Sequence, residues 1–217
     1  MKKISLLFSL FFLVSCAYES KKELTIYPSR QPQLLEPIIE NFYQETGIKV
    51  NLLSGNAQEL MERIDIEGDQ SKADIFMTVD AGVLWQAAQR DIFSETKSQI
   101  LEENIPTYFR DPNGMWFGLS KRARTIVYSN DQFSDTDFSS YEDLANPKWK
   151  GKLCLRTSKK VYNRSLIASM IDAHGFDKAK EVVAGWVANL TTEVFSNDTN
   201  ALKAVSSGQC GVTIVNT

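Results

Sequence analysis

The sequence predicts an α/β protein of two lobes, with mixed sheets flanked by helices. A strand, a polar turn and a helix follow one another at residues 24–42, and the same order recurs at residues 151–175. In both stretches a short apolar run precedes apolar residues at helical spacing. With 217 residues, 43% of them hydrophobic, the chain can bury one large core or two small ones. Two such turns, one in each half, are what a cleft between two lobes is built from.

The first half of the chain alternates strands with helices. We expect parallel pairing and right-handed crossovers from this order. Pro37 is tolerated in the first helix only if its first turn begins near Gln33 or Leu34. The expected strands are Leu24–Tyr27, Ile48–Leu52 and Ala73–Val79, and the expected helices run from about 33 to Gly47, over Gln58–Ile66, and from Asp80 through Ala88.

The second half predicts shorter elements and more turns. Residues 111–114 form a turn, and Asn146-Pro147 stops a short helix that begins at Tyr141. Further predictions are strands at 115–119, 125–128, 151–156 and 211–215, and helices at 165–174 before Gly175, at 177–188, and from a cap at Asp198 to Gly208.

The lobes are placed at residues 24–118 and 119–217. The last predicted strand coincides with the last residues of the sequence, so we expect the second lobe to be incomplete and a return to the first lobe to be missing. We interpret the chain as a fragment or an early stop.

The N-terminus has the pattern of a secretory signal. Lys2 and Lys3 precede an apolar run over residues 4–14, which is far shorter than the ~20 residues of a membrane-spanning helix. The run ends at Ser15-Cys16, which resembles a bacterial lipobox. We therefore expect residues 1–16 to be a lipoprotein signal peptide with Cys16 lipidated, residues 17–23 to be a tether, and the protein to lie in the periplasm or at the cell surface, anchored in the membrane. The alternative is an ordinary cleaved signal with a cysteine nearby by chance.

The remaining cysteines and the net charge limit the chemistry and the partners that the sequence supports. Cys154 and Cys210 form an even pair in an oxidising compartment, which predicts a disulfide; the alternative is two buried thiols. A net charge of -3 without long basic runs argues against nucleic acid as a partner, and we expect a monomer. One histidine, no Cys-x-x-Cys and no glycine-rich phosphate loop give little support for an enzyme.

Five segments carry a resemblance to a known family. They resemble the ferric-iron-binding subunits of bacterial ABC importers, which have a type II periplasmic-binding-protein fold, and the likeness runs from about Leu24 to Thr217. The segment at 141–151 is shared with other type II binding proteins, whereas those at 116–124 and 161–163 are more specific to the iron branch. The segments are residues 27–32, 72–80, 116–124, 141–151 and 211–217.

The resemblance implies that Tyr162 is a metal ligand. In that family a metal is held between two lobes by tyrosine phenolates, and an anion at a helix terminus completes its shell. Ferric iron is hard and favours anionic oxygen, and a metal charge deprotonates a phenol whose free pKa is ~10. The alternative is a tyrosine that packs its ring on the lobe with its hydroxyl at the surface.

Two departures from the family pattern bear on the site. Many relatives carry His-Tyr where this chain has Gln31-Pro32, so Arg30 and Gln31 are expected instead to bind a synergistic carbonate-like anion. The alternative for Arg30 is a surface ion pair. The family's adjacent tyrosine pair follows the position of Asn216-Thr217, and the sequence ends before it.

Three more residues are possible parts of the cleft. Asp80 either reaches the cleft or caps a helix, and Arg122 and Arg124 either line the cleft or are surface charges near a hinge. His174 serves as a favourable charge at a helix C-terminus.

The leading hypothesis is a lipid-anchored binding protein that captures ferric iron (Fe³⁺), with a carbonate-like anion, and delivers it to the permease of an ABC importer. One alternative is a receptor for another solute, an anion or an organic cation, on the same fold. Another is a truncated remnant that binds nothing.

Overall fold

The computed structural model describes residues 23–217. The predicted signal peptide, Cys16 and most of the tether lie outside the described residues. By its internal contacts the chain divides into one unit that runs up to Val79 and includes 89–92, and a second unit of 80–88 and 93–217. The predicted lobe boundary between 118 and 119 stays a prediction. Among residues 23–217, no helix is both long enough and apolar enough to cross a bilayer.

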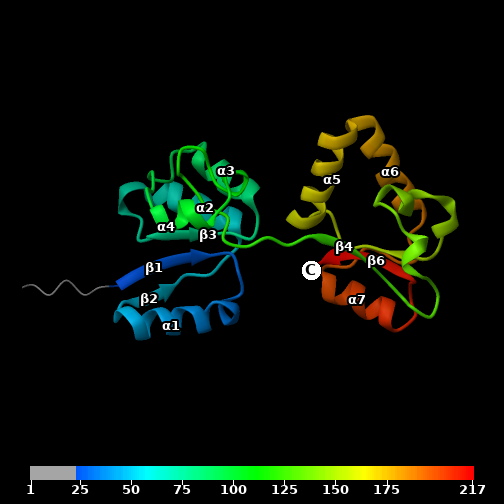
Figure 1. Cartoon of the computed structure of the whole chain (residues 1–217), viewed down its shortest axis with the longest axis horizontal. Helices are drawn as coiled ribbons and strands as arrows, with labels where there is room; N and C mark the ends of the chain where they lie inside the picture. Colours follow the sequence, from blue (N-terminus) through cyan, green and yellow to red (C-terminus); the bar gives the residue numbers. More distant parts are fainter. Residues whose placement is uncertain (1–22) are drawn as a thin grey trace, which may run out of the picture. The chain divides into compact units, whose positions relative to one another are not determined.

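The first unit is built on a parallel sheet, as the alternating pattern predicts. Its strands are β1 (Glu23–Pro28), β2 (Lys49–Leu52) and β3 (Ile75–Met77), in the order β2-β1-β3 (Figure 1). Ile26 of β1 lies opposite Leu52 on one side and Ile75 on the other. The prediction of parallel pairing is therefore confirmed.

Two helices of the first unit differ in how they pack. Helix α2 (Ala57–Glu67) buries Leu60 and Ile64 in a small core with Tyr27 of β1. Helix α1 (Glu36–Thr46) packs beside β2 yet buries none of its residues. It begins later than predicted, because a 3-10 turn at Pro32–Leu34 precedes it.

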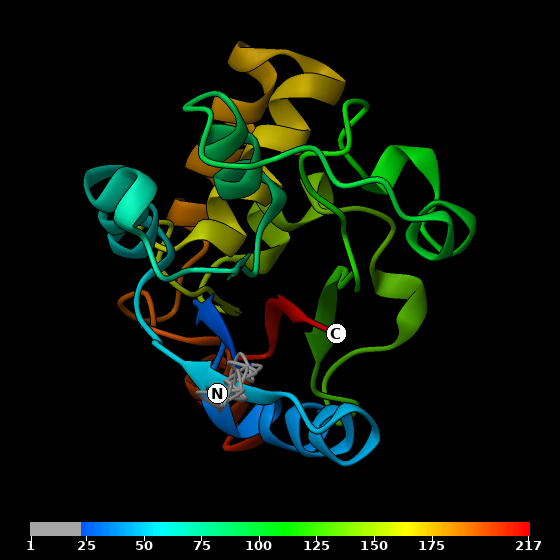
Figure 2. The same cartoon turned by 90° about the vertical axis from the view of Figure 1, so that its left-hand side faces the viewer.

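The second unit has a mixed sheet. Its strands are β4 (Arg124–Tyr128), β5 (Leu153–Cys154) and β6 (Val212–Asn216), with β6 in the centre. Strand β6 runs antiparallel to β4 and parallel to β5, and Figure 2 shows it (red) beside β4 (green). The predicted strand at 115–119 is wrong: within it only Phe117 forms an isolated bridge, to Arg110.

The helices and turns around this sheet follow the predicted pattern with changed ends. Residues 99–104 form a helix that the sequence did not predict, and the short helix expected at Tyr141 is a 3-10 turn that ends before Asn146, as predicted, with a second 3-10 turn after it. The helices of the second unit are α3 (Ala81–Ala88), α4 (Gln99–Asn104), α5 (Val161–His174), α6 (Phe176–Ala188) and α7 (Asp198–Ser206). Besides Pro32–Leu34, the 3-10 turns are Gly68–Gln70 in the first unit, and Thr107–Phe109, Asp135–Asp137, Glu142–Ala145 and Pro147–Trp149 in the second.

Two of these changes affect candidate site residues. Helix α5 begins at Val161 rather than at Ser165, so Tyr162 lies in the first turn of the helix and not in a polar turn before it. Helix α7 is capped by Asn197, whose side chain accepts a 2.9 Å hydrogen bond from the Asn200 backbone N–H. The prediction that Asp198 is the cap is therefore wrong, and its carboxylate is free for other partners.

The sheet of the second unit separates two apolar layers. Figure 1 shows α5 and α6 on one side of β4 and β6, and α7 on the other. Successive residues of a strand point to opposite faces, so Leu153 joins the core under α5 and α6, whereas Cys154 joins the layer under α7. There Cys154 forms the predicted disulfide with Cys210, with an S–S distance of 2.06 Å.

Candidate functional site

Tyr162 lies between two arginine side chains. Arg122 donates a hydrogen bond of 2.9 Å from Nη2 to the Tyr162 hydroxyl, and its guanidinium carbon is 5.0 Å from the centre of the ring. The guanidinium carbon of Arg156 is 4.8 Å from the same ring centre. Arg122 is exposed and Tyr162 is half-buried. The phenol oxygen therefore accepts a hydrogen bond from a cation and has two positive charges close by.

The start of α5 adds to this positive environment. Lys160 occupies the cap position of α5 but forms no side-chain cap. The first backbone N–H groups of a helix have no partner within the helix, and the helix dipole places partial positive charge at this end. Tyr162, in the first turn of this 14-residue helix, lies in that field.

Arg124 lies inside the second unit rather than on its surface. Its side chain is only 8% exposed and donates hydrogen bonds to Asp198 Oδ2 at 2.8 Å and to Asn163 Oδ1 at 2.8 Å. It also donates to Asn216 Oδ1 at 3.1 Å and to the Ile214 carbonyl. Burial lowers the pKa of Arg124, while the Asp198 carboxylate opposes that shift. The expected role of Arg124 as a surface charge near a hinge is therefore wrong, because its side chain forms a buried ion pair, whereas its role in lining a cleft stays a prediction.

Arg156, Asn163 and Asp198 are site residues that the sequence reasoning missed. Asp198 Oδ1 is 3.2 Å from Arg156 Nη1, and Asn163 donates from Nδ2 to the Arg156 carbonyl at 2.7 Å. Arg156 and Asn163 are buried. A sequence signal existed, since a buried strand ending in arginine requires an acidic partner elsewhere. The sequence did not show which carboxylate this was.

Asp80 caps a helix, as one of its two expected roles predicts. Its Oδ1 accepts a 2.9 Å hydrogen bond from the Gly82 backbone N–H, in the first turn of α3. Its Oδ2 accepts a 2.9 Å hydrogen bond from the Ser165 hydroxyl of α5. Asp80 thus connects α3 to the helix that carries Tyr162.

Arg30 and Gln31 lie in the first unit, between β1 and the 3-10 turn that precedes α1. Gln31 Oε1 accepts a hydrogen bond from Gln33 Nε2 at 3.0 Å, and Arg30 is half-buried. Their role in anion binding stays a prediction.

At the C-terminal end of α5, His174 pairs with an acidic residue from another part of the chain. Its Nε2 is 2.8 Å from Glu142 Oε1. Across residues 23–217, no three His, Cys, Asp or Glu side chains gather in a way that could hold a metal ion.

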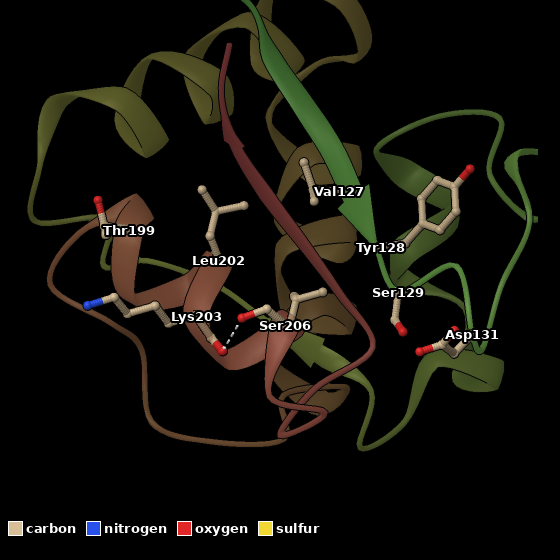
Figure 3. A pocket seen from close by; sticks show the side chains of 9 residues that line it. Val127, Tyr128, Ser129, Asp131, Thr199, Leu202, Lys203 and Ser206 are labelled. Atoms are coloured by element: carbon tan, nitrogen blue, oxygen red, sulfur yellow. Dashed lines mark hydrogen bonds between the residues drawn. The ribbon is translucent and has the colours of Figure 1, made fainter.

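A pocket of about 470 Å³ lies between β4 and α7, and Tyr162 is not among its lining residues (Figure 3). Its wall includes Leu202 and Val127, and the Tyr128 hydroxyl points away from Leu202. The lining residues are Val127, Tyr128, Ser129, Asp131, Thr199, Leu202, Lys203, Val205 and Ser206. None of these is a predicted site residue, and the pocket has no arginine to pair with its phenol.

Comparison with known proteins identifies what the chain is similar to. Residues 70–217 match a family model described as bacterial extracellular solute-binding protein. The chain is 45% identical over 197 residues to iron uptake protein A1 of a Synechocystis strain. That match covers 91% of this chain and 55% of the relative, so the chain spans about half the length of this curated relative.

Solved structures show the same fold. A Trichodesmium protein called IdiA or FutA, in complex with iron and citrate, is 42% identical, with a TM-score of 0.82 over 90% of this chain and 62% of that chain. A ferric binding protein from Campylobacter jejuni is 36% identical, with a TM-score of 0.84 over 89% of this chain and 62% of that chain. These neighbours are type II periplasmic binding proteins, which confirms the predicted fold class.

Proposed function

The chain belongs to the bacterial extracellular solute-binding protein family, and we propose that it captures ferric iron outside the cytoplasm and hands it to the permease of an ABC importer. The names of its relatives, an iron uptake protein and a ferric binding protein, support this cargo. These relatives are transport proteins, which also supports a binding role rather than an enzymatic one. Iron is the cargo in this proposal, not a resident cofactor.

The observation that carries the proposal is the hydrogen bond from Arg122 to the Tyr162 hydroxyl. Ferric iron favours anionic oxygen ligands, and a phenol binds it best as the phenolate. A phenolate in a half-buried position needs positive charge nearby, which Arg122, Arg156 and the start of α5 supply. When iron binds, Arg122 can stay beside the oxygen or turn to an anion that shares the metal.

An anion that shares the metal is the second part of the proposal. We infer that a planar oxyanion, carbonate-like or a carboxylate, completes the ligand shell, with Arg30 and Gln31 as its candidate binding residues. A guanidinium grips such an anion in a fork. One structural relative contains citrate with its iron, which supports an anion without deciding its identity for this chain.

The test is a titration of the metal-free chain with ferric iron supplied as the citrate complex, followed by visible absorption. A tyrosine phenolate bound to ferric iron gives a coloured charge-transfer band. We expect this band in the unaltered chain, its loss in Tyr162→Phe, and its retention in the control Tyr108→Phe, because Tyr108 is 75% exposed on the surface. A colourless unaltered chain would overturn the proposal that ferric iron is the cargo. A band that survives in Tyr162→Phe would overturn the proposal that Tyr162 is the ligand.

A receptor for an anion alone is a second candidate. The exposed Arg122 and the start of α5, where no side chain caps the helix, would suit a carboxylate or phosphate without metal. Calorimetry with citrate in the absence of iron decides between the two: tight binding without metal, together with no colour on adding iron, favours the second candidate.

The predicted lipid anchor at Cys16 remains a proposal about location. A lipid at this position would keep the protein at the outer face of the membrane, close to a permease. Mass spectrometry of the protein from the membrane fraction checks it, with Cys16→Ser as the control: an unmodified Cys16 would refute the anchor.

A further inference from the structure

One carboxylate in the second unit holds three groups that come from distant parts of the chain. Asp198, in the first turn of α7, binds Arg124 of β4 at 2.8 Å and Arg156, which follows β5, at 3.2 Å. Its Oδ2 also accepts a hydrogen bond of 3.1 Å from the Asn216 backbone N–H of β6. The Asp198 side chain is 18% exposed and both arginines are 8% exposed.

Asp198 is the carboxylate that pairs with both buried cations of this cluster, Arg124 and Arg156. Buried charges are expensive unless they are paired, and removing one partner leaves the other uncompensated. Arg124 and Arg156 repel one another, and Asp198 is placed between them. The 3.2 Å contact between Asp198 Oδ1 and Arg156 Nη1 is an ion pair without aligned hydrogen-bond geometry, so charge, together with a long 3.5 Å hydrogen bond from Arg156 Nη2 to the Ser196 carbonyl, holds that guanidinium.

Both arginines act on Tyr162 or on its neighbour in α5. The guanidinium of Arg156 lies over the Tyr162 ring, and Arg124 holds the side chain of Asn163. Asn163 in turn donates to the Arg156 carbonyl. We propose that Asp198 is the positioning residue for Tyr162: it keeps Arg156 against the ring and Arg124 against Asn163, and so fixes the direction of the phenol oxygen.

This inference rests on the proposed function in one respect, that Tyr162 is the metal ligand. Metal ligands must be held within about 0.5 Å of their productive geometry by supporting residues, and loss of such a support typically lowers metal affinity 10–100-fold. A half-buried phenol in the first turn of a helix has few local restraints. The Arg156 guanidinium over the ring and the hydrogen-bonded side chain of Asn163 supply these restraints.

The first arm of the test uses no metal. Tyrosine ring ¹³C NMR of the chain, with the Tyr162 signal assigned by its loss in Tyr162→Phe, reports the environment of that ring. We expect Asp198→Asn to displace the Tyr162 signal and Asp198→Glu to restore part of the native position. Asp177→Asn is the matched control, because Asp177 also lies in the first turn of a helix, α6, but is exposed; it should leave the signal in place.

The second arm measures ferric affinity with citrate as the competing ligand. We expect Asp198→Asn to weaken binding about 10–100-fold and to shift or broaden the charge-transfer band, whereas Asp177→Asn changes affinity less than twofold. A folded Asp198→Asn variant with the native ring signal and native affinity would overturn the proposal. If the wild type gives no band, the iron assignment fails, and the NMR arm still decides whether Asp198 positions Tyr162.

A third variant covers the case in which Asp198→Asn does not fold. Arg156→Gln leaves Asp198 paired with Arg124, and so leaves a neutral buried pair. It should displace the same ring signal, because it removes the group that Asp198 holds against Tyr162. An unchanged ring signal in this variant would overturn the proposed route through Arg156.

Discussion

Two tyrosines in the two units have opposite electrostatic partners. Tyr27 of β1 is 1% exposed and donates its hydroxyl hydrogen to Glu67 Oε2 at 3.2 Å. Burial raises the pKa of Tyr27, and the Glu67 carboxylate raises it further, although the Arg63 guanidinium 5.5 Å from the ring centre opposes both effects. Tyr162 instead accepts a hydrogen bond from Arg122.

The comparison shows that an arginine near a tyrosine ring is not enough to make a candidate ligand. Each of the two rings has a guanidinium over it. The difference lies in the direction of the hydrogen bond. The Tyr27 hydroxyl must keep its proton to serve its carboxylate partner, whereas the Tyr162 oxygen already serves as an acceptor for a cation, as it would beside a metal.

The largest expected difference between the two regions concerns the disulfide, which occurs only in the unit of Tyr162 among the described residues. Cys154 and Cys210 are 56 residues apart, and a bridge that closes a loop of this length contributes about 4 kcal/mol in the chain-entropy model. We expect Cys154→Ala/Cys210→Ala to lower the free energy of unfolding of the second unit by roughly this amount.

Hydrogen exchange followed by mass spectrometry checks this expectation by region. Peptides from β5 and β6 should lose protection in the double variant, and peptides from β1 and β2 should keep theirs. Equal loss in both units would contradict the separation on which the comparison depends, because the units would then unfold as one.

A smaller effect is expected to distinguish Arg122, which lies over the Tyr162 ring, from Arg63, which lies over the Tyr27 ring. We expect Arg122→Gln to weaken ferric binding about 10–100-fold, because it removes the donor to the proposed ligand oxygen. Arg122 is exposed, so folding should be unaffected. Arg63→Gln, the matched change beside Tyr27, should leave ferric affinity unaltered in the same citrate competition. If both variants lost the same affinity, the loss would come from the change in net charge alone.

The smallest expected effect is on stability at alkaline pH. Tyr27→Phe removes one hydrogen bond and should cost about 1 kcal/mol in urea unfolding at neutral pH. The pKa of Tyr27 is raised in the folded protein, so its contribution is complete below the unfolded value of about 10 and is lost as the pH rises above it.

The pH dependence of unfolding tests the raised pKa of Tyr27. Unfolding of the unaltered chain should become easier above about pH 10, and Tyr27→Phe should remove part of this slope. Tyr162→Phe is the control for removing a tyrosine hydroxyl elsewhere in the chain. An unchanged slope in Tyr27→Phe would show that the Tyr27 hydroxyl and its hydrogen bond to Glu67 do not cause the loss of stability at alkaline pH.

The sequence predicted the elements whose signal is local. Short apolar runs located β1, β4 and β6, alternation located β2, and the left-handed Gly47, with φ of 69°, ended α1 as expected. The strand predicted at 115–119 failed because, after the turn that Gly114 closes by donating to the Asp111 carbonyl, its pairing stops at the isolated bridge between Phe117 and Arg110. An apolar run alone does not specify a partner strand.

The candidate site was only partly predictable, because its supports come from far along the chain. Tyr162 was found through the family resemblance. The earlier start of α5 was not predicted, since Tyr162 and Asn163 are weak helix formers, and the hydrogen bonds that hold them come from distant residues, Arg122 and Arg124 respectively. Arg124 and Asp198 are 74 residues apart, and no periodicity in the sequence connects them.

The central place of β6 in its sheet has a consequence for biosynthesis. Strand β6 pairs Arg124 with Asn216, so the surroundings of Tyr162 depend on contacts across 92 residues. During translation, β4, β5 and α5 leave the ribosome before their central strand exists, whereas β1, β2 and β3 emerge early and pair with near neighbours. A nascent chain would therefore expose the unit of Tyr162 to chaperones and proteases longest.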